Sequence, residues 1–149
     1  MKGDCMKRII CVLLILCMIP AFSFAVDLDE FNTFSSVLGA SELDMNEAKV
    51  SGKHIGFVKD GCNVYIDEVN GKIDGIYIQG QGDSYLAYCC AAVHVFDPNG
   101  NTTQNHGQVL TMYLMAHETN EYMTGQTQNG YYFFIQKQDN GFFFLIGEA

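Results

Sequence analysis

Two turn dipeptides, Asp60-Gly61 and Asn70-Gly71, constrain the fold of this chain more than any other feature of its sequence. They divide the segment 54–80 into three runs in which apolar and polar residues alternate. Alternation with a period of two is typical of half-buried strands, and Asp-Gly and Asn-Gly are strong signals for tight hairpin turns. The segment is therefore predicted to form a three-stranded antiparallel meander.

The register of this meander depends on the length of each turn, and a two-residue turn is predicted at the first. At the second turn, a two-residue loop would place Asp67 opposite Asp74, and the two carboxylates would repel each other. A three-residue loop, which pairs Val64 with Ile76, is therefore predicted there. One face of the meander then carries Ile55, Phe57, Cys62, Val64, Ile66, Ile76 and Ile78, and the other carries Asn63, Tyr65, Asp67 and Tyr77.

The last segment, residues 131–147, is predicted to form a second hairpin around Asp139-Asn140-Gly141. A three-residue loop pairs Ile135 with Leu145, and both faces of the hairpin are then apolar. Such strands lie inside a sheet that is covered on both sides, or one of their faces contacts a partner. One face would carry Tyr131, Phe133, Ile135, Phe143 and Leu145, and the other Tyr132, Phe134, Phe142, Phe144 and Ile146.

Three segments show the three- and four-residue apolar spacing or the capping residues of helices, at about residues 27–39, 85–96 and 105–116. The fold class predicted from this order is α+β. We expect an antiparallel sheet of about five strands, formed by the three-stranded meander and the C-terminal hairpin, with two to three helices packed on one face.

The first 25 residues have the layout of a secretory signal peptide. A basic start is followed by an apolar stretch over residues 9–19, by Pro20, and by small residues that end at Ala25. Cleavage after Ala25 is predicted, which leaves residues 26–149 as a single α+β domain in a periplasmic or extracellular location. The alternative is a retained anchor, because the uncharged run from residue 9 to 26 approaches the length of a membrane span.

After residue 25 the chain has five lysines, no arginine and sixteen acidic residues, which gives a net charge of −11. This charge repels nucleic-acid phosphates and anionic lipid headgroups. Nucleic-acid binding and stable membrane insertion after cleavage are therefore not expected. Cationic partners would suit the charge, although an acidic surface also simply keeps an exported protein soluble.

The cysteines and histidines offer one arrangement that could carry chemistry. Cys90 and His94 lie four residues apart on a predicted helix, and a thiolate and an imidazole are the minimum for nucleophilic catalysis. Most such pairs in an apolar helix are packing residues. Cys62 is a candidate for a disulfide with Cys89 or Cys90, and the alternative is that all three are small buried side chains.

Asp97, Asn99 and Asn101 alternate in the way that the first ligands of a calcium loop do. The later positions disagree, because Thr102 replaces the glycine and Gln108 the bidentate acid. Turns closed by Asp and Asn side chains explain the same residues. No cofactor is expected, because the sequence has no Gly-rich phosphate loop and no GxSxG elbow.

The sequence favours a non-enzymatic module of the cell envelope or exterior that binds a protein partner through an aromatic sheet face. One alternative is a small cysteine-dependent enzyme that uses Cys90 and His94. Another is a structural envelope protein that associates with itself through the same face. The candidate contact residues are Tyr65, Tyr77, Tyr132, Phe134, Phe142 and Phe144.

Expression of the full chain in a secreting host should yield a product that begins at Val26, because a signal peptidase cuts after small residues at the first and third positions before the bond. Intact mass of the exported protein measures this. Ala25→Arg should block the cut and keep the full-length mass in the membrane fraction. A wild-type chain found uncut in that fraction would contradict cleavage and point to the anchor.

Overall fold

The computed structural model describes residues 27–147, so the predicted signal peptide and its cleavage site lie outside the described residues. Residues 27–37 form an N-terminal helix. The elements that follow are η1 (Met45–Glu47), β1 (Lys49–Ser51), β2 (His54–Lys59), β3 (Cys62–Val69), β4 (Lys72–Gly80), α2 (Gly82–Phe96), α3 (Thr102–Thr119), β5 (Tyr122–Gln126), β6 (Tyr132–Gln138) and β7 (Gly141–Gly147).

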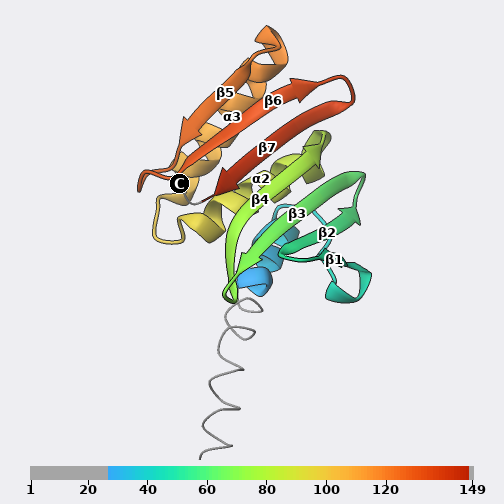
Figure 1. Ribbon diagram of the computed structural model, residues 1–149. Helices are drawn as coiled ribbons and strands as arrows, with labels where there is room; N and C mark the ends of the chain where they lie inside the picture. The colour runs from blue at the N-terminus through green and yellow to red at the C-terminus, as the bar shows by residue number, and fades with distance from the viewer. Residues whose placement is uncertain (1–26, 148–149) are drawn as a thin grey trace, which may run out of the picture.

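The strands form one antiparallel sheet in the order β1-β2-β3-β4-β7-β6-β5 (Figure 1). This confirms the α+β class, but the sheet has seven strands where about five were predicted. The two additional strands are β1 and β5, at the two edges. Both are short and largely polar and lack clear apolar alternation, so the sequence pattern does not reveal them.

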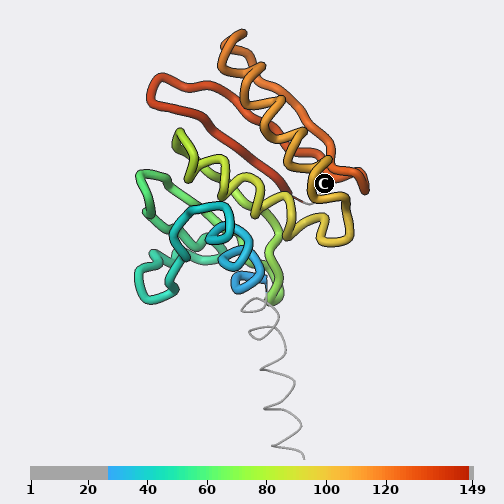
Figure 2. The backbone as a smooth tube through the Cα atoms, turned by 180° about the vertical axis from the view of Figure 1, so that it is seen from behind, coloured from blue at the N-terminus to red at the C-terminus, as the bar shows by residue number. Residues whose placement is uncertain are grey.

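The helices cover one face of the sheet (Figures 1 and 2). Helix α2 lies over the middle and is buried on most sides, since its small residues Ala87, Ala91 and Ala92 allow close approach to the strands. Within residues 27–147, no helix combines the length and the apolar character needed to cross a membrane. The core between the layers is built from the apolar side chains of all these elements.

The first turn of the meander confirms the predicted register, but the second does not. Asn70 and Gly71 form a two-residue turn with φ values of 53° and 78°, where three residues were predicted. A bulge then adds Asp74 to β4, so that Asp67 pairs with Gly75. Asp67 therefore does not lie opposite Asp74, and the bulge removes the repulsion for which a longer loop was predicted. It also keeps the predicted core face, with Val64 opposite Ile78 and Ile66 opposite Ile76.

The C-terminal hairpin corrects a second prediction. Its turn contains two residues, so Ile135 pairs with Phe144 and not with Leu145. A slip of one residue exchanges the two faces of a strand. Phe142 and Phe144, both predicted to be contact residues, therefore point toward the helices and are only 4% and 0% exposed. The first residue of β7, Gly141, must be a glycine. Its φ is 128°, and a Cβ atom there would lie 2.6 Å from the backbone oxygen of Gly80.

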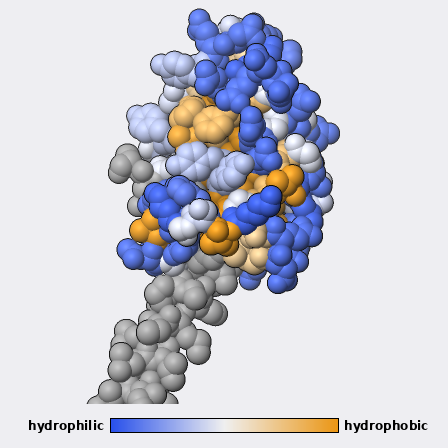
Figure 3. Space-filling view, turned by 45° about the vertical axis from the view of Figure 1, so that its right-hand side comes forward, coloured by the Kyte–Doolittle hydropathy of each residue, from blue (hydrophilic) through white to orange (hydrophobic). Residues whose placement is uncertain are grey.

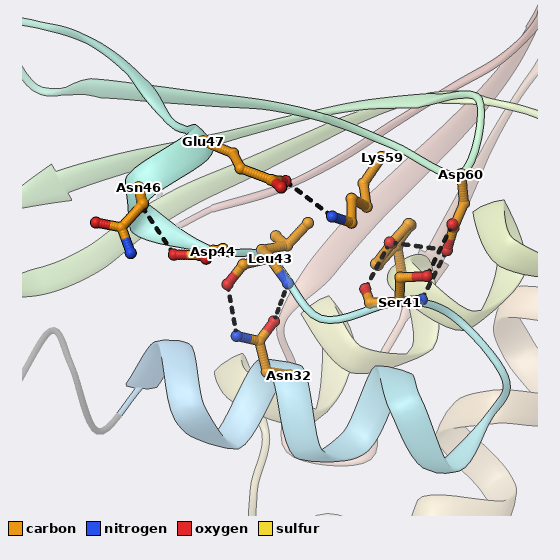
Figure 4. A network of polar contacts seen from close by, with 9 residues as sticks. Asn32, Ser41, Leu43, Asp44, Asn46, Glu47, Lys59 and Asp60 are labelled. Atoms are coloured by element: carbon orange, nitrogen blue, oxygen red, sulfur yellow. Dashed lines mark hydrogen bonds and ion pairs between the residues drawn. The ribbon is translucent and has the colours of Figure 1, made fainter.

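A polar network fastens the N-terminal helix and the following segment to the sheet (Figure 4). The Asn32 amide donates to the oxygen of Leu43 at 2.9 Å and accepts from its nitrogen at 2.8 Å. In the first hairpin turn, the Asp60 carboxylate accepts from both the backbone nitrogen and the hydroxyl of Ser41. The backbone hydrogen bond from Ser41 is the main cause that lowers the pKa of Asp60. Tyr88 on α2 completes the network by donating to the Ser41 oxygen at 2.7 Å.

Asn32→Ala should lower the free energy of unfolding by about 2–4 kcal/mol, because it leaves two buried backbone groups of Leu43 without partners. Urea denaturation measures the change. Ser36→Ala on the exposed side of the same helix is the control and should alter stability by less than about 0.5 kcal/mol. If Asn32→Ala is as mild as this control, the network does not hold the segment in place.

Candidate functional site

The face of the sheet opposite the helices carries a row of large side chains across its four central strands. Tyr65 on β3 pairs with Tyr77 on β4, which pairs with Leu145 on β7. Leu145 in turn pairs with Phe134 on β6. Side chains of directly paired residues share one face of a sheet. The helix-free face therefore has a continuous row of aromatic and apolar groups, which we call the open face.

Phe143 connects the aromatic rings of this face into a ridge. Its ring centroid lies 6.5 Å from that of Tyr77 and 5.9 Å from that of Phe134. These are distances at which aromatic rings attract each other. Figure 3 shows apolar residues near the middle of the molecular surface, with hydrophilic residues around them. At the margins of the ridge, Tyr65 is 46% exposed and Tyr132 is 64% exposed.

Two glycines make room for tyrosine rings on the open face. A Cβ atom at Gly56 would lie 3.2 Å from the ring of Tyr65, its partner on the neighbouring strand. A Cβ atom at Gly75 would lie 3.5 Å from the ring of Tyr77. Each ring thus fills the space that a missing side chain leaves on the strand surface. The two tyrosines are therefore positioned before any partner binds.

A buried carboxylate lies at one end of the ridge. Asp67 is only 2% exposed, although it belongs to the open face. Its oxygens lie 2.5 Å from Nδ1 of His54, 3.4 Å from Nζ of Lys53 and 3.5 Å from the hydroxyl of Tyr77. These contacts satisfy the charge that burial would otherwise penalise. Burial raises the pKa of Tyr77, and the charge on Asp67 raises it further.

A hollow of about 310 Å³ opens beside this carboxylate. Gly75 and Gly147 are paired on adjacent strands, so two neighbouring positions lack side chains. This shared gap forms the floor of the hollow. Rings and apolar groups form the walls, and acids and a lysine form one end. The lining groups on the open face are Lys53, Asp67, Asp74, Tyr77, Thr124, Tyr132, Phe134 and Leu145.

The structure brings together four of the six predicted contact residues, Tyr65, Tyr77, Tyr132 and Phe134, while Phe142 and Phe144 belong to the core. Sequence reasoning assigned Phe143 and Leu145 to the wrong face. A two-residue turn at Asp139-Asn140 would have assigned Phe143 and Leu145 to the open face. Sequence reasoning also missed the contacts of Asp67 with His54 and Lys53, although the confirmed β2–β3 register places His54 directly opposite Asp67.

Cys90 and His94 do not form an activated pair in the structure. Burial raises the pKa of the Cys90 thiol to about 12, whereas a nucleophilic cysteine needs a lowered pKa. His94 turns to the N-terminal helix instead. Its ring stacks on Phe34 with centroids 4.1 Å apart, and Nε2 lies 3.2 Å from a carboxylate oxygen of Glu30. These contacts give His94 a role in packing the helix.

The three cysteines of the described residues carry free thiols. Burial raises the pKa of both Cys62 and Cys89. The charges of the Cys90 and Cys62 thiols raise the pKa of Cys89 further. The Tyr85 hydroxyl is buried beside the Cys89 thiol. A disulfide of Cys62 with Cys89 or Cys90 remains a prediction, which mass spectrometry of the unreduced chain can test.

The calcium candidates do not converge on one point. Asp97 is buried and its carboxylate accepts hydrogen bonds from the side chains of Asn105 and Asn129. The Asn101 side chain caps α3 by accepting from the nitrogen of Gln104. Hydrogen bonds lower the pKa of Asp97 although burial, the largest single influence, opposes them. The cluster joins the α2–α3 connection to the β5–β6 turn, and Asn99 is exposed.

No cluster of three or more His, Cys, Asp or Glu side chains suited to a metal ion occurs within residues 27–147. No family model, curated protein or solved structure matches this chain.

His106 on α3 supplies a pH test of how the helices pack. Its ring meets Phe34 edge-on at 5.2 Å, and its Nε2 is buried without a partner. Burial lowers the pKa of His106, and the charge of His94 lowers it further. A histidine with a lowered pKa binds its proton more readily in the unfolded chain, so folding becomes less stable as the pH falls through about 6.5.

His106→Phe should remove this part of the pH dependence, because it keeps a ring against Phe34 but cannot bind a proton. Urea unfolding at pH 7.5 and at pH 5.5 measures it, with the wild type losing more stability than the variant on acidification. His94 and Glu30, which face the same ring cluster, are present in both proteins. An equal loss in both proteins would show that His106 does not titrate on unfolding.

Proposed function

We propose that this chain is a non-enzymatic binding module that engages a protein partner through the open face of its sheet. The observation that carries the proposal is the one-sided cover: helices protect one face, while the other presents the ridge of Tyr77, Phe143 and Phe134. Large contiguous apolar surfaces on soluble proteins mark interaction sites. The ridge has the composition expected of such a site.

The chemistry of the open face supports contact with a protein. Tyrosine and phenylalanine are enriched at the centres of protein interfaces, where they bury much area and lose little side-chain freedom. Tyr65 and Tyr77 are already fixed over glycines, which reduces the entropy lost on binding. The exposed Tyr132 and the polar groups beside the hollow supply a margin that can form hydrogen bonds.

The proposed place of action is outside the cytoplasm. This part of the proposal rests on the basic, apolar and small-residue order of the first 25 residues. An acidic surface without arginine agrees with it, since such a surface keeps an exported domain soluble.

Phe143→Ala should abolish partner capture and leave the fold intact, because its half-buried ring lies in the ridge and outside the core. Residues 26–149 serve as bait against envelope and culture fractions, and circular dichroism checks the fold. Leu114→Ala is the control, since it removes an exposed apolar side chain from the helical side of the domain. Its capture should equal that of the wild type.

Phe144→Ala, one residue along the same strand, should instead destabilise the domain by about 3–5 kcal/mol, because that ring is fully buried. A partner retained equally by wild type and Phe143→Ala would overturn the proposal. If the captured protein is a second copy of this chain, ultracentrifugation will show a dimer that Phe143→Ala dissociates. That result would replace the partner with self-association.

A further inference from the structure

We infer that the hollow between β4, β7 and β6 binds an arginine side chain of the protein partner. This inference rests on the proposed function and names the chemical group that the open face recognises. The hollow of about 310 Å³ has aromatic walls, a floor at two glycines, and two carboxylates with one lysine at one end. An organic cation is the chemical class that uses all three features.

The walls offer ring surface to a cation. Tyr77, Tyr132 and Phe134 come from two strands and line the same space. Gly75 pairs with Gly147, so neither position supplies a side chain to the floor, and the ring of Tyr77 lies next to Gly75. A Cβ atom at Gly147 would approach only backbone atoms of Asp74 and Gly75, which shows that side chains leave this position open. Cations bind over aromatic faces when such rings surround a partly desolvated space.

The carboxylates set the sign of the charge that is bound. Asp67 is already held by Lys53 and His54, so it contributes a local charge that is largely balanced. Asp74 also lines the hollow, but it forms an ion pair with none of the lysines or histidines among residues 27–147. The bulge that adds Asp74 to β4 therefore presents an unpaired carboxylate to the ligand.

The surroundings reinforce this preference. Burial raises the pKa of the Tyr77 hydroxyl, and the charges of Asp67 and Asp74 raise it further, whereas the charge of Lys53 lowers it. The negative charges thus extend their field to the ring that lines the hollow. An anionic ligand would meet this field and a chain whose net charge after residue 25 is −11.

Arginine fits these groups better than lysine does. Its guanidinium is planar, so it can stack on a tyrosine or phenylalanine ring while its edge donates to a carboxylate. It is also more weakly hydrated than an ammonium group and therefore loses less on entering a partly apolar hollow. The rings of Tyr77 and Phe134 and the carboxylate of Asp74 supply both kinds of contact.

The probe for the test is N-acetyl-arginine methylamide, added to ¹⁵N-labelled residues 26–149. The amide signals of Gly75 and Gly147 should shift and saturate. N-acetyl-citrulline methylamide has nearly the same shape without the charge and should bind roughly tenfold more weakly or not at all. The corresponding lysine derivative should bind more weakly than the arginine derivative.

Asp74→Asn should weaken binding of the arginine probe about three- to fivefold, because it removes one charge of a partly exposed pair. Asp139→Asn makes the same change in the β6–β7 turn, at the other end of the strands from Tyr132 and Gly147, and should leave binding unchanged. Tyr132→Ala should weaken binding without affecting the fold, since this side chain is 64% exposed.

Equal binding of the arginine and citrulline probes would overturn the inference, as would an Asp74→Asn variant that binds arginine like the wild type. A stronger response to lysine would overturn the assignment to arginine. These outcomes are separate from the proposed function. If Phe143→Ala abolishes partner capture while the arginine probe fails to bind, the open face is the interface but the hollow does not accept arginine.

Discussion

The pairing of β4 with β7 is the contact on which the rest of the structure depends. The strands β1 to β4 and the strands β5 to β7 are each joined to their neighbours in sequence, and only this pair unites the two groups. The connection between the groups contains both α2 and α3, and these helices pack on the same face. A sheet of seven strands is thus covered on one side. The open face, its aromatic ridge and its hollow are consequences of that arrangement.

The sequence allowed the fold class, the meander and its core face to be predicted, because alternation and the Asp-Gly and Asn-Gly turns depend on local geometry. It did not allow the edge strands β1 and β5 to be predicted, since edge strands gain less from burial and show weaker patterns. Turn length was the main source of error. For the second and last turns, three residues were predicted where the structure has two. Asp67 and Asp74 do avoid facing each other, as expected, but a bulge in β4 separates them and the turn is not longer.

The same error explains what could be predicted of the candidate site. Tyr65 and Tyr77 were assigned correctly because the bulge restored the alternation of the meander. In the last hairpin, both faces are apolar, so no contrast between polar and apolar residues reveals a slip of one residue. Phe142 and Phe144 were therefore exchanged with Phe143 and Leu145. The hollow could not be predicted at all, because the pairing of Gly75 with Gly147 joins segments that are distant in the sequence.

The central strand pair also sets the order in which the chain can fold. Within each group, the antiparallel neighbours are linked by short turns or loops, so their contacts form after little loss of chain entropy. The β4–β7 contact instead closes a loop that includes two helices and two strands. Contacts that are this distant in sequence slow folding. Until this contact forms, the inner edges of both groups carry unpaired backbone groups, and the chain is then most exposed to pairing with another copy.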